Sequence, residues 1–80
     1  MEEPLRQRIQ VDPRVMAGKP IIRGTRIPVE IIVRMLAQGV AEAEILREYP
    51  RLRTEDIRAA LTYAAETLAH EDVFPHTVSP

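Results

Sequence analysis

The sequence contains no cysteine, no tryptophan and one phenylalanine, and aromatic residues make up 4% of the chain. The absence of cysteine excludes disulfides and thiol catalysis. No apolar run approaches the about 18 residues of a membrane-spanning helix, so the sequence predicts no membrane span. Residues 1–4 lack the basic and apolar regions of a signal peptide, and we therefore expect a cytoplasmic protein.

Side-chain combinations that carry catalysis or bind metals are also scarce. The chain has one serine, Ser79, and no Ser–His or paired-acid arrangement stands out. The pair Gly18-Lys19 lacks the glycine spacing and the following hydroxyl of a phosphate-binding loop. The histidines and acids within residues 70–76 lie near the C-terminal end and indicate adventitious rather than designed metal binding. We therefore expect no enzymatic activity, no metal site and no cofactor.

The remaining composition is that of a small soluble domain, because 45% of its 80 residues are hydrophobic and 29% are charged. A domain of this size buries a modest fraction of its surface, so a partner subunit would stabilise it. Residues 1–40 hold seven cations and four anions, whereas residues 41–80 hold four cations and eight anions. This asymmetry suits contacts with both a nucleic acid and a basic partner, and chance scatter in a short chain is the alternative.

The first third of the chain predicts a β arm. Residues 1–7 are expected to be a disordered start. Residues 8–12 alternate polar and apolar side chains, which is typical of a half-buried strand, and residues 21–23 form a second, β-branched strand. The two strands can pair antiparallel. Because a lone hairpin is marginal in water, it needs a helix or a second copy of the chain beside it.

The rest of the chain predicts three helices and a short tail, over residues 28–38, 42–49, 54–70 and 71–80. Pro28 suits the first turn of the first helix, and Gly39 suits its end. Pro50 stops the second helix, and Thr54 caps the third. The second and third helices, joined by a tight turn, have helix-turn-helix spacing.

Apolar positions predict how these helices pack. The third helix has a core-facing stripe of Ile57, Ala60, Leu61, Ala64 and Leu68. The first helix is apolar nearly all round, which a core of this size cannot cover, and this favours a homo-oligomer. The candidate interface residues are Ile22, Ile27, Ile31, Ile32 and Met35. The alternative is that the β arm folds over that face within one chain.

A ten-residue motif over residues 18–27, which reads GKPIIRGTRI, resembles the signature of the prokaryotic family called domain of unknown function 433. Further matches are Asp12-Pro13, Ala37-Gln38-Gly39, Ile45-Leu46, Tyr49-Pro50, Thr54-Glu55-Asp56-Ile57, Ala59-Ala60-Leu61 and Tyr63-Ala64-Ala65. The resemblance implies a homeodomain-type helix-turn-helix fold with an N-terminal β arm. It also implies an antitoxin that acts beside a PIN-like nuclease toxin.

We therefore predict a mainly α fold, a three-helix homeodomain-like helix-turn-helix bundle with an N-terminal β-hairpin arm, over residues 8–70. The predicted function is that of an antitoxin-like homo-oligomer that binds a partner nuclease toxin, with its own promoter DNA as a further ligand. The alternative is a protein–protein interaction module that binds no DNA.

Cationic residues are the candidates for nucleic-acid contacts. Because Glu55 and Asp56 open the third helix and would repel phosphates, the arm is the better candidate. The predicted phosphate contacts of the arm are Arg8, Lys19, Arg23 and Arg26. Arg51 and Arg53 before the third helix, and Arg58 within it, are secondary candidates. The alternative is that Arg23 and Arg26 bind carbonyls and carboxylates across a dimer seam.

Overall fold

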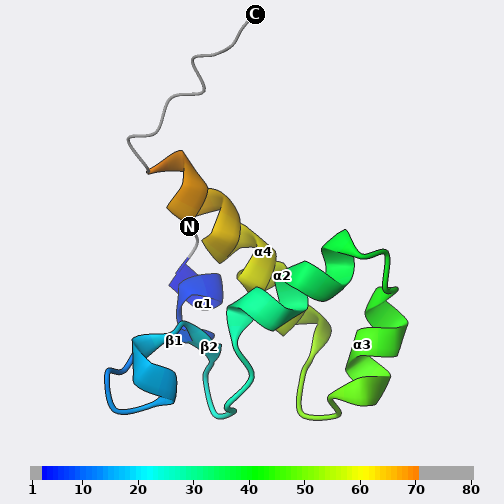
Figure 1. Cartoon of the computed structure of the whole chain (residues 1–80), viewed down its shortest axis with the longest axis horizontal. Helices are drawn as coiled ribbons and strands as arrows, with labels where there is room; N and C mark the ends of the chain where they lie inside the picture. Colours follow the sequence, from blue (N-terminus) through cyan, green and yellow to red (C-terminus); the bar gives the residue numbers. More distant parts are fainter. Residues whose placement is uncertain (1–2, 71–80) are drawn as a thin grey trace, which may run out of the picture.

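The computed structural model describes residues 3–70; residues 1–2 and the predicted tail over residues 71–80 lie outside the described part. The described residues form four α-helices, one 3-10 turn and two short strands (Figure 1). In chain order the elements are α1 (Glu3–Arg6), β1 (Ile9–Gln10), η1 (Met16–Gly18), β2 (Ile21–Ile22), α2 (Val29–Ala37), α3 (Glu42–Glu48) and α4 (Thr54–Ala69). The fold is mainly helical with a small antiparallel sheet, as the sequence predicts. None of the helices in residues 3–70 is both long and apolar enough to cross a membrane.

The two strands pair antiparallel, with Ile9 opposite Ile22 and Gln10 opposite Ile21. The pairing is as predicted, but each strand is shorter than its predicted range. The sheet ends after Ile22 because Gly24, with φ of 82°, turns the chain away. The hairpin joins the core of its own chain, since Ile9 and Ile22 belong to one apolar cluster with Ile32 and β1 contacts α4.

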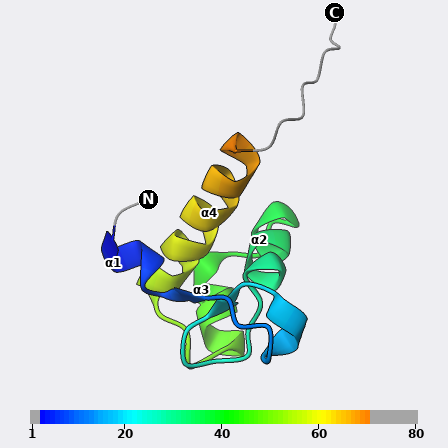
Figure 2. The same ribbon diagram turned by 90° about the vertical axis from the view of Figure 1, so that its left-hand side faces the viewer.

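Residues 1–7 were predicted to be disordered, but the described part of this segment contains a helix. Glu3–Arg6 is a helical turn, and Leu5 within it is 8% exposed and belongs to the core. This turn packs against α4 (Figure 2). Leu5 provides the reason, because its side chain leaves water for an apolar surface that only the folded chain creates.

The ends of the three longer helices agree with the predictions to within one residue. Pro28 precedes α2 as its N-cap, and Gly39 follows it with φ of 89°. Thr54, however, is the first helical residue of α4 rather than its cap. The backbone N–H of Arg53 instead donates to the carboxylate of Asp56 at 2.9 Å, so the acid in the first turn closes this end.

The core is aliphatic and lies where the β arm, α2, α3 and α4 meet. Its buried members are Leu5, Ile9, Ile22, Val29, Ile32, Ile45, Leu52, Ile57, Ala59 and Ala60. Two of the five predicted interface residues, Ile22 and Ile32, are thus buried inside their own chain. Ile27 and Met35 are half-buried against the same core, and Ile31 is 37% exposed. The β arm thus contributes Ile9 and Ile22 to the core that buries Ile32. Whether the rest of the apolar surface of α2 is covered by the arm or by a second copy of the chain stays a prediction.

The buried face of α4 is rotated from the predicted stripe. Ile57 and Ala60 are fully buried as predicted, and Ala59 is buried beside them. Leu61 and Leu68 are 43% and 68% exposed, although both belong to the predicted stripe. Leu68 belongs to the last turn of α4, and this end of the helix projects beyond α2 and α3 (Figures 1 and 2).

Candidate nucleic-acid interface

Asp56, one of the two acids expected to repel phosphates from α4, does not face solvent. The residue is 5% exposed, and its two carboxylate oxygens have separate partners. Oδ2 accepts the Arg53 backbone N–H at 2.9 Å, and Oδ1 accepts from Arg8 Nη1 at 3.0 Å. Only Glu55 of the two acids is exposed. Of the two acids at this end of α4, only Glu55 is therefore placed to repel DNA phosphates.

Lys19, a predicted phosphate contact of the arm, lies beside an acid of α2. Its Nζ is 3.4 Å from Oε1 of Glu30, and the second carboxylate oxygen of Glu30 accepts from Arg34 one helical turn later. All three side chains are more than half exposed, so each pair contributes little stability. The positive charge of Lys19 is nevertheless partly neutralised by the neighbouring carboxylate of Glu30.

Arg23 and Arg8 are held by the fold itself. The Arg23 guanidinium donates to the backbone carbonyls of Gln7 and Ile9, which ties the end of β2 to β1. The carbonyl-binding alternative for Arg23 is therefore found, within one chain. Arg8 is engaged by Asp56. Three of the four predicted arm contacts thus have a partner inside the protein.

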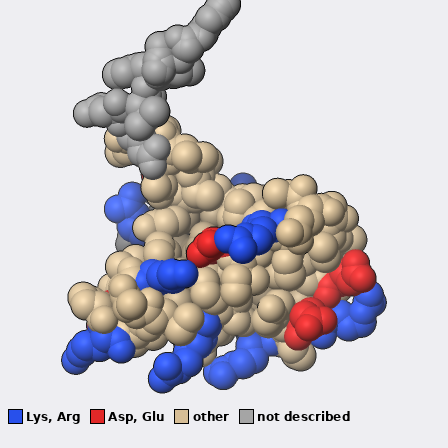
Figure 3. Space-filling model, in the orientation of Figure 1, with Lys and Arg blue, Asp and Glu red and all other residues tan. Residues whose placement is uncertain are grey.

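The other four predicted nucleic-acid contacts remain available. They are exposed, and within the described part of the chain their side chains have neither an ion pair nor a hydrogen bond: Arg26, Arg51, Arg53 and Arg58. Figure 3 shows Lys and Arg side chains along the edge that carries the loop after β2 and the turn between α3 and α4, at the bottom of the view. Acidic side chains on this face lie mainly over α3, on the right.

A hollow of about 430 Å³ lies at this edge. It is lined by Gln10, Val15, Ile21, Gly24, Thr25, Arg26 and Arg51. The hollow brings together Arg26 from the loop after β2 and Arg51 from the turn before α4. Sequence reasoning placed these residues in two separate groups, because only the tertiary fold sets the loop beside the turn.

A second hollow, of about 520 Å³, is an apolar groove between α2 and α4. Its floor and walls are formed by Pro20, Val29, Val33, Ala37, Tyr63, Ala64, Thr67 and Leu68. Glu30 and Arg34 also line it. None of the five predicted interface residues lines this groove. Its signal in the sequence is the pair of Val33 and Ala37, whose i, i+4 spacing places both on one flank of α2.

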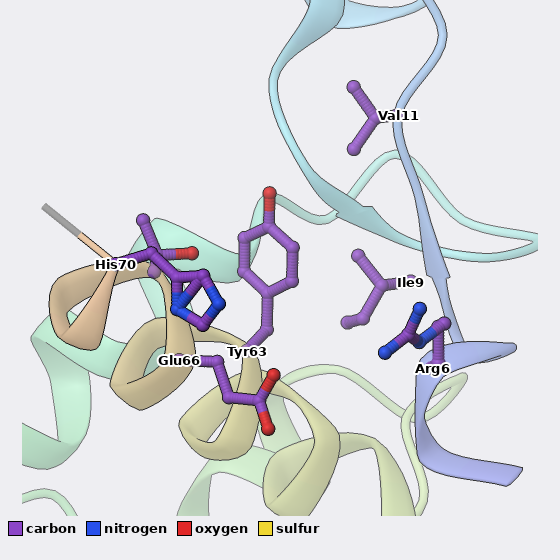
Figure 4. A pocket seen from close by; sticks show the side chains of 7 residues that line it. Arg6, Ile9, Val11, Tyr63, Glu66 and His70 are labelled. Carbon is purple, nitrogen blue, oxygen red and sulfur yellow. The ribbon is translucent and has the colours of Figure 1, made fainter. Parts of the chain in front are cut away.

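A third hollow, of about 500 Å³, lies between β1 and the C-terminal half of α4 (Figure 4). It is lined by Arg6, Ile9, Val11, Tyr63, Glu66, Thr67 and His70. The ring of Tyr63 points from α4 toward the arm, with Ile9 across the hollow from it (Figure 4). Within the described part of the chain, no three acids or histidines are grouped as a metal site requires.

Residues 9–64 match the sequence family described as "Protein of unknown function (DUF433)". The chain belongs to this family. The match runs from β1 into α4 and includes Arg26, Arg51, Arg53 and Arg58. It confirms the family that the motif over residues 18–27 indicates.

Three other proteins resemble this DUF433 chain. "Uncharacterized protein y4eO" of Sinorhizobium fredii (strain NBRC 101917 / NGR234) is 36% identical over 59 residues, which are 74% of this chain and 27% of that protein. An uncharacterized protein of Archaeoglobus fulgidus is 59% identical over 29 residues, which are 36% of this chain and 81% of that one. The crystal structure of a DUF433 member protein from Anabaena variabilis has 39% identity and a TM-score of 0.75.

The structural match covers 84% of this chain and 66% of the Anabaena variabilis chain. The chain thus spans about a quarter of the Sinorhizobium fredii relative and just under two thirds of the Anabaena variabilis protein. With 39% identity, the likeness extends beyond the arrangement of helices to the sequence that forms them.

Proposed function

We propose that this DUF433 chain is an antitoxin-like, homo-oligomeric protein of the helix-turn-helix type that binds its own promoter DNA and a PIN-like nuclease toxin. In this proposal α3 and α4 are the two helices of the helix-turn-helix unit, and α4 enters the major groove. The observation that carries it is the burial of Asp56 against Arg8, because this pairing leaves the exposed charge around the start of α4 mainly positive.

The proposal assigns the phosphate contacts to the loop and the turn rather than to the arm. Arg26, Arg51 and Arg53 neutralise backbone phosphates, and Arg58 on the outer face of α4 reaches base edges. Arg8 and Arg23 instead hold the arm in place, since each donates to an acceptor within the chain. The arm thereby becomes a structural element that positions the cationic edge.

The protein partners are assigned to other surfaces. We propose that a second copy of the chain covers the apolar groove between α2 and α4. Leu68 is 68% exposed beside apolar Val33 and Ala37, and this arrangement leaves apolar surface in water until a partner buries it. Glu30 and Arg34 at the groove carry opposite charges, which is compatible with a two-fold contact between identical surfaces. The toxin assignment rests on the family resemblance, and a cytoplasmic location remains a prediction.

The groove also favours a second candidate function. A chain whose groove contacts another protein, and whose arginines only keep it soluble, would be a protein–protein interaction module without DNA binding. Glu55 supports this alternative, because it is an exposed acid in the first turn of α4, the end of a recognition helix that contacts DNA.

Fluorescence anisotropy separates the two functions. A labelled duplex from the region upstream of the gene and a scrambled duplex of equal length are titrated at several salt concentrations. If the chain binds its promoter, it should bind the upstream duplex more tightly than the scrambled one. The logarithm of the affinity should then fall by about 0.9 per phosphate contact for each tenfold rise in salt concentration. Equal and negligible binding of both duplexes would reject DNA binding and support the protein–protein interaction module. Co-purification with the product of the adjacent reading frame tests the toxin assignment separately.

A further inference from the structure

We propose that the hollow lined by Arg26 and Arg51 is a phosphate-binding site in which the two guanidinium groups hold one phosphate between them. The identification of that phosphate as part of a nucleic-acid backbone rests on the proposed function. The binding chemistry itself does not, because a free phosphorylated molecule would present the same oxygens.

The loop that carries Arg26 is built to hold its shape. The Thr25 hydroxyl donates to the Ile22 carbonyl at 2.7 Å and accepts the Ile27 backbone N–H at 3.0 Å. Gly24 adopts a φ of 82°, and a Cβ there would meet nothing within 4 Å, so the glycine serves the backbone turn rather than close packing. Gly24 and Thr25 therefore have structural roles, whereas the side chain of Arg26 takes no part in the hydrogen bonds that close the loop.

The segment that carries Arg51 is anchored on its other side. Leu52 is 5% exposed in the core, and its backbone N–H donates to the Tyr49 carbonyl at 2.9 Å. Arg51 itself is exposed. Both arginines thus project from fixed backbone, which lowers the conformational cost of holding a ligand between them.

Other arginines of this chain have partners within the protein. Arg14 binds the carboxylate of Asp12, and Arg23 binds two backbone carbonyls. Arg26 and Arg51 have no such partner among the described residues, although they line one hollow. Two like charges at one site repel each other, and an anion between them removes that repulsion.

Phosphate fits the donors of this hollow. Each guanidinium presents a planar fork of N–H donors that matches two phosphate oxygens. No acid belongs to the described lining, and Gln10 adds a neutral amide donor. A carboxylate ligand would satisfy one fork, whereas a phosphate can satisfy both.

The test uses the full chain and two probes, inorganic phosphate and the upstream duplex. Arginine Nε–Hε signals are followed by NMR during a phosphate titration of the wild type, Arg26→Ala and Arg51→Ala. Arg47→Ala is the matched control, because it removes the same charge from exposed α3 and lines none of the hollows. The double variant with both Arg26→Ala and Arg51→Ala is measured as well, and circular dichroism melting checks that all five proteins fold.

The signals of Arg26 and Arg51 should move together in the wild type, and either alanine variant should abolish the shift at the remaining arginine. Each variant should also weaken duplex binding about tenfold and reduce the salt slope by about 0.9, as expected for one lost phosphate contact. The affinity of the double variant for the duplex should be at most about twofold below that of either single variant, because both side chains act on the same phosphate. Arg47→Ala should bind within twofold of the wild type.

The outcomes separate this site from the proposed function. Phosphate shifts at both arginines without any duplex binding would support the site with a free phosphorylated ligand and reject the DNA-binding role. The opposite outcome is that Arg26→Ala and Arg51→Ala bind the duplex as tightly as Arg47→Ala does and that phosphate causes no shift. This result would overturn the site and would leave the DNA-binding role standing.

Discussion

The guanidinium of Arg8 lies 3.0 Å from the carboxylate of Asp56, and this pair joins the β arm to the first turn of α4. The two side chains are 34% and 7% exposed, so the carboxylate is buried while the guanidinium still reaches water. Asp56 also accepts the Arg53 backbone N–H, which makes one side chain both a helix cap and a tether for the arm. The position of the arm and the charge at the start of α4 therefore depend on the same contact.

Removing either partner of this pair should destabilise the fold. Asp56→Ala should lower the free energy of unfolding by about 2–4 kcal/mol, since it removes the cap and leaves Arg8 without its acceptor. Arg8→Ala should cost about 1–3 kcal/mol, because the buried carboxylate keeps only the Arg53 N–H. Urea denaturation followed by circular dichroism measures both.

Arg14→Ala is the control for the Arg8 pair, because Arg14 also pairs with an aspartate but is 89% exposed. That exposed pair should contribute less than about 0.5 kcal/mol. If Arg8→Ala unfolds at the same urea concentration as Arg14→Ala, the arm is not held through Asp56.

The sequence predicted what depends on local chemistry. The starts and ends of the longer helices follow from Pro28, Gly39 and Pro50, which act on the backbone next to them. The antiparallel pairing of the short strands follows from β-branched residues on either side of a turn. In each case the deciding interaction spans a few residues, so the pattern contains it.

Long-range packing decided what the sequence did not predict. An acid in the first helical turn ordinarily faces solvent and the helix dipole, and only Arg8, 48 residues away, turns Asp56 inward. Leu61 matches an apolar stripe, yet the stripe does not tell which flank of α4 meets the core. Leu5 lies in a helix of four residues, which is too short for any periodicity. The hollow that joins Arg26 to Arg51 is likewise a product of tertiary structure.

Thr25→Val should destabilise the loop after β2. The substitution keeps the volume of the side chain but removes the hydroxyl that bridges the Ile22 carbonyl and the Ile27 N–H. We expect a loss of about 1–2 kcal/mol in the free energy of unfolding and faster amide exchange at Ile27. Thr25→Ser, which retains the hydroxyl, should stay within about 0.5 kcal/mol of the wild type. Equal stability of the two variants would assign the turn to Gly24 alone.

The carboxyl of Asp12 should titrate below its ordinary pKa of 3.8. The Arg14 side chain lowers the pKa of Asp12 most, and the Arg14 backbone N–H lowers it further. Because the pKa falls on folding, the contact stabilises the folded state above pH 3.8 and loses its effect as the pH falls through the lowered value.

An NMR titration of the Asp12 carboxyl carbon in the folded protein measures this pKa directly. Arg14→Ala should raise the pKa of Asp12 toward 3.8 without fully restoring it, because the backbone N–H at residue 14 remains as a donor. Lys19→Ala serves as the control, since it removes a cation that is paired elsewhere, and it should leave the Asp12 titration unchanged. A pKa of Asp12 that is the same with and without the Arg14 side chain would contradict the assignment.

The apolar groove between α2 and α4 should be the self-association surface. Leu68→Glu places a charge where the proposed second copy buries an apolar side chain, and Val33→Glu does so on the opposite wall. An unpaired charge in such an interface costs several kcal/mol, so each variant should sediment as a monomer at concentrations where the wild type is a dimer. Sedimentation velocity at micromolar concentration decides this, with circular dichroism to confirm folding.

Ile31→Glu is the control that makes the groove experiment specific. Ile31 is 37% exposed on α2 but does not line the groove, whereas Ile32, one residue on, is fully buried and would unfold the chain if charged. Ile31→Glu should therefore leave the sedimentation coefficient of the wild type unchanged. If Ile31→Glu dissociates the dimer while Leu68→Glu and Val33→Glu do not, the copies associate through the opposite flank of α2. A wild type that is monomeric at all concentrations would instead reject self-association and leave the groove to a different protein.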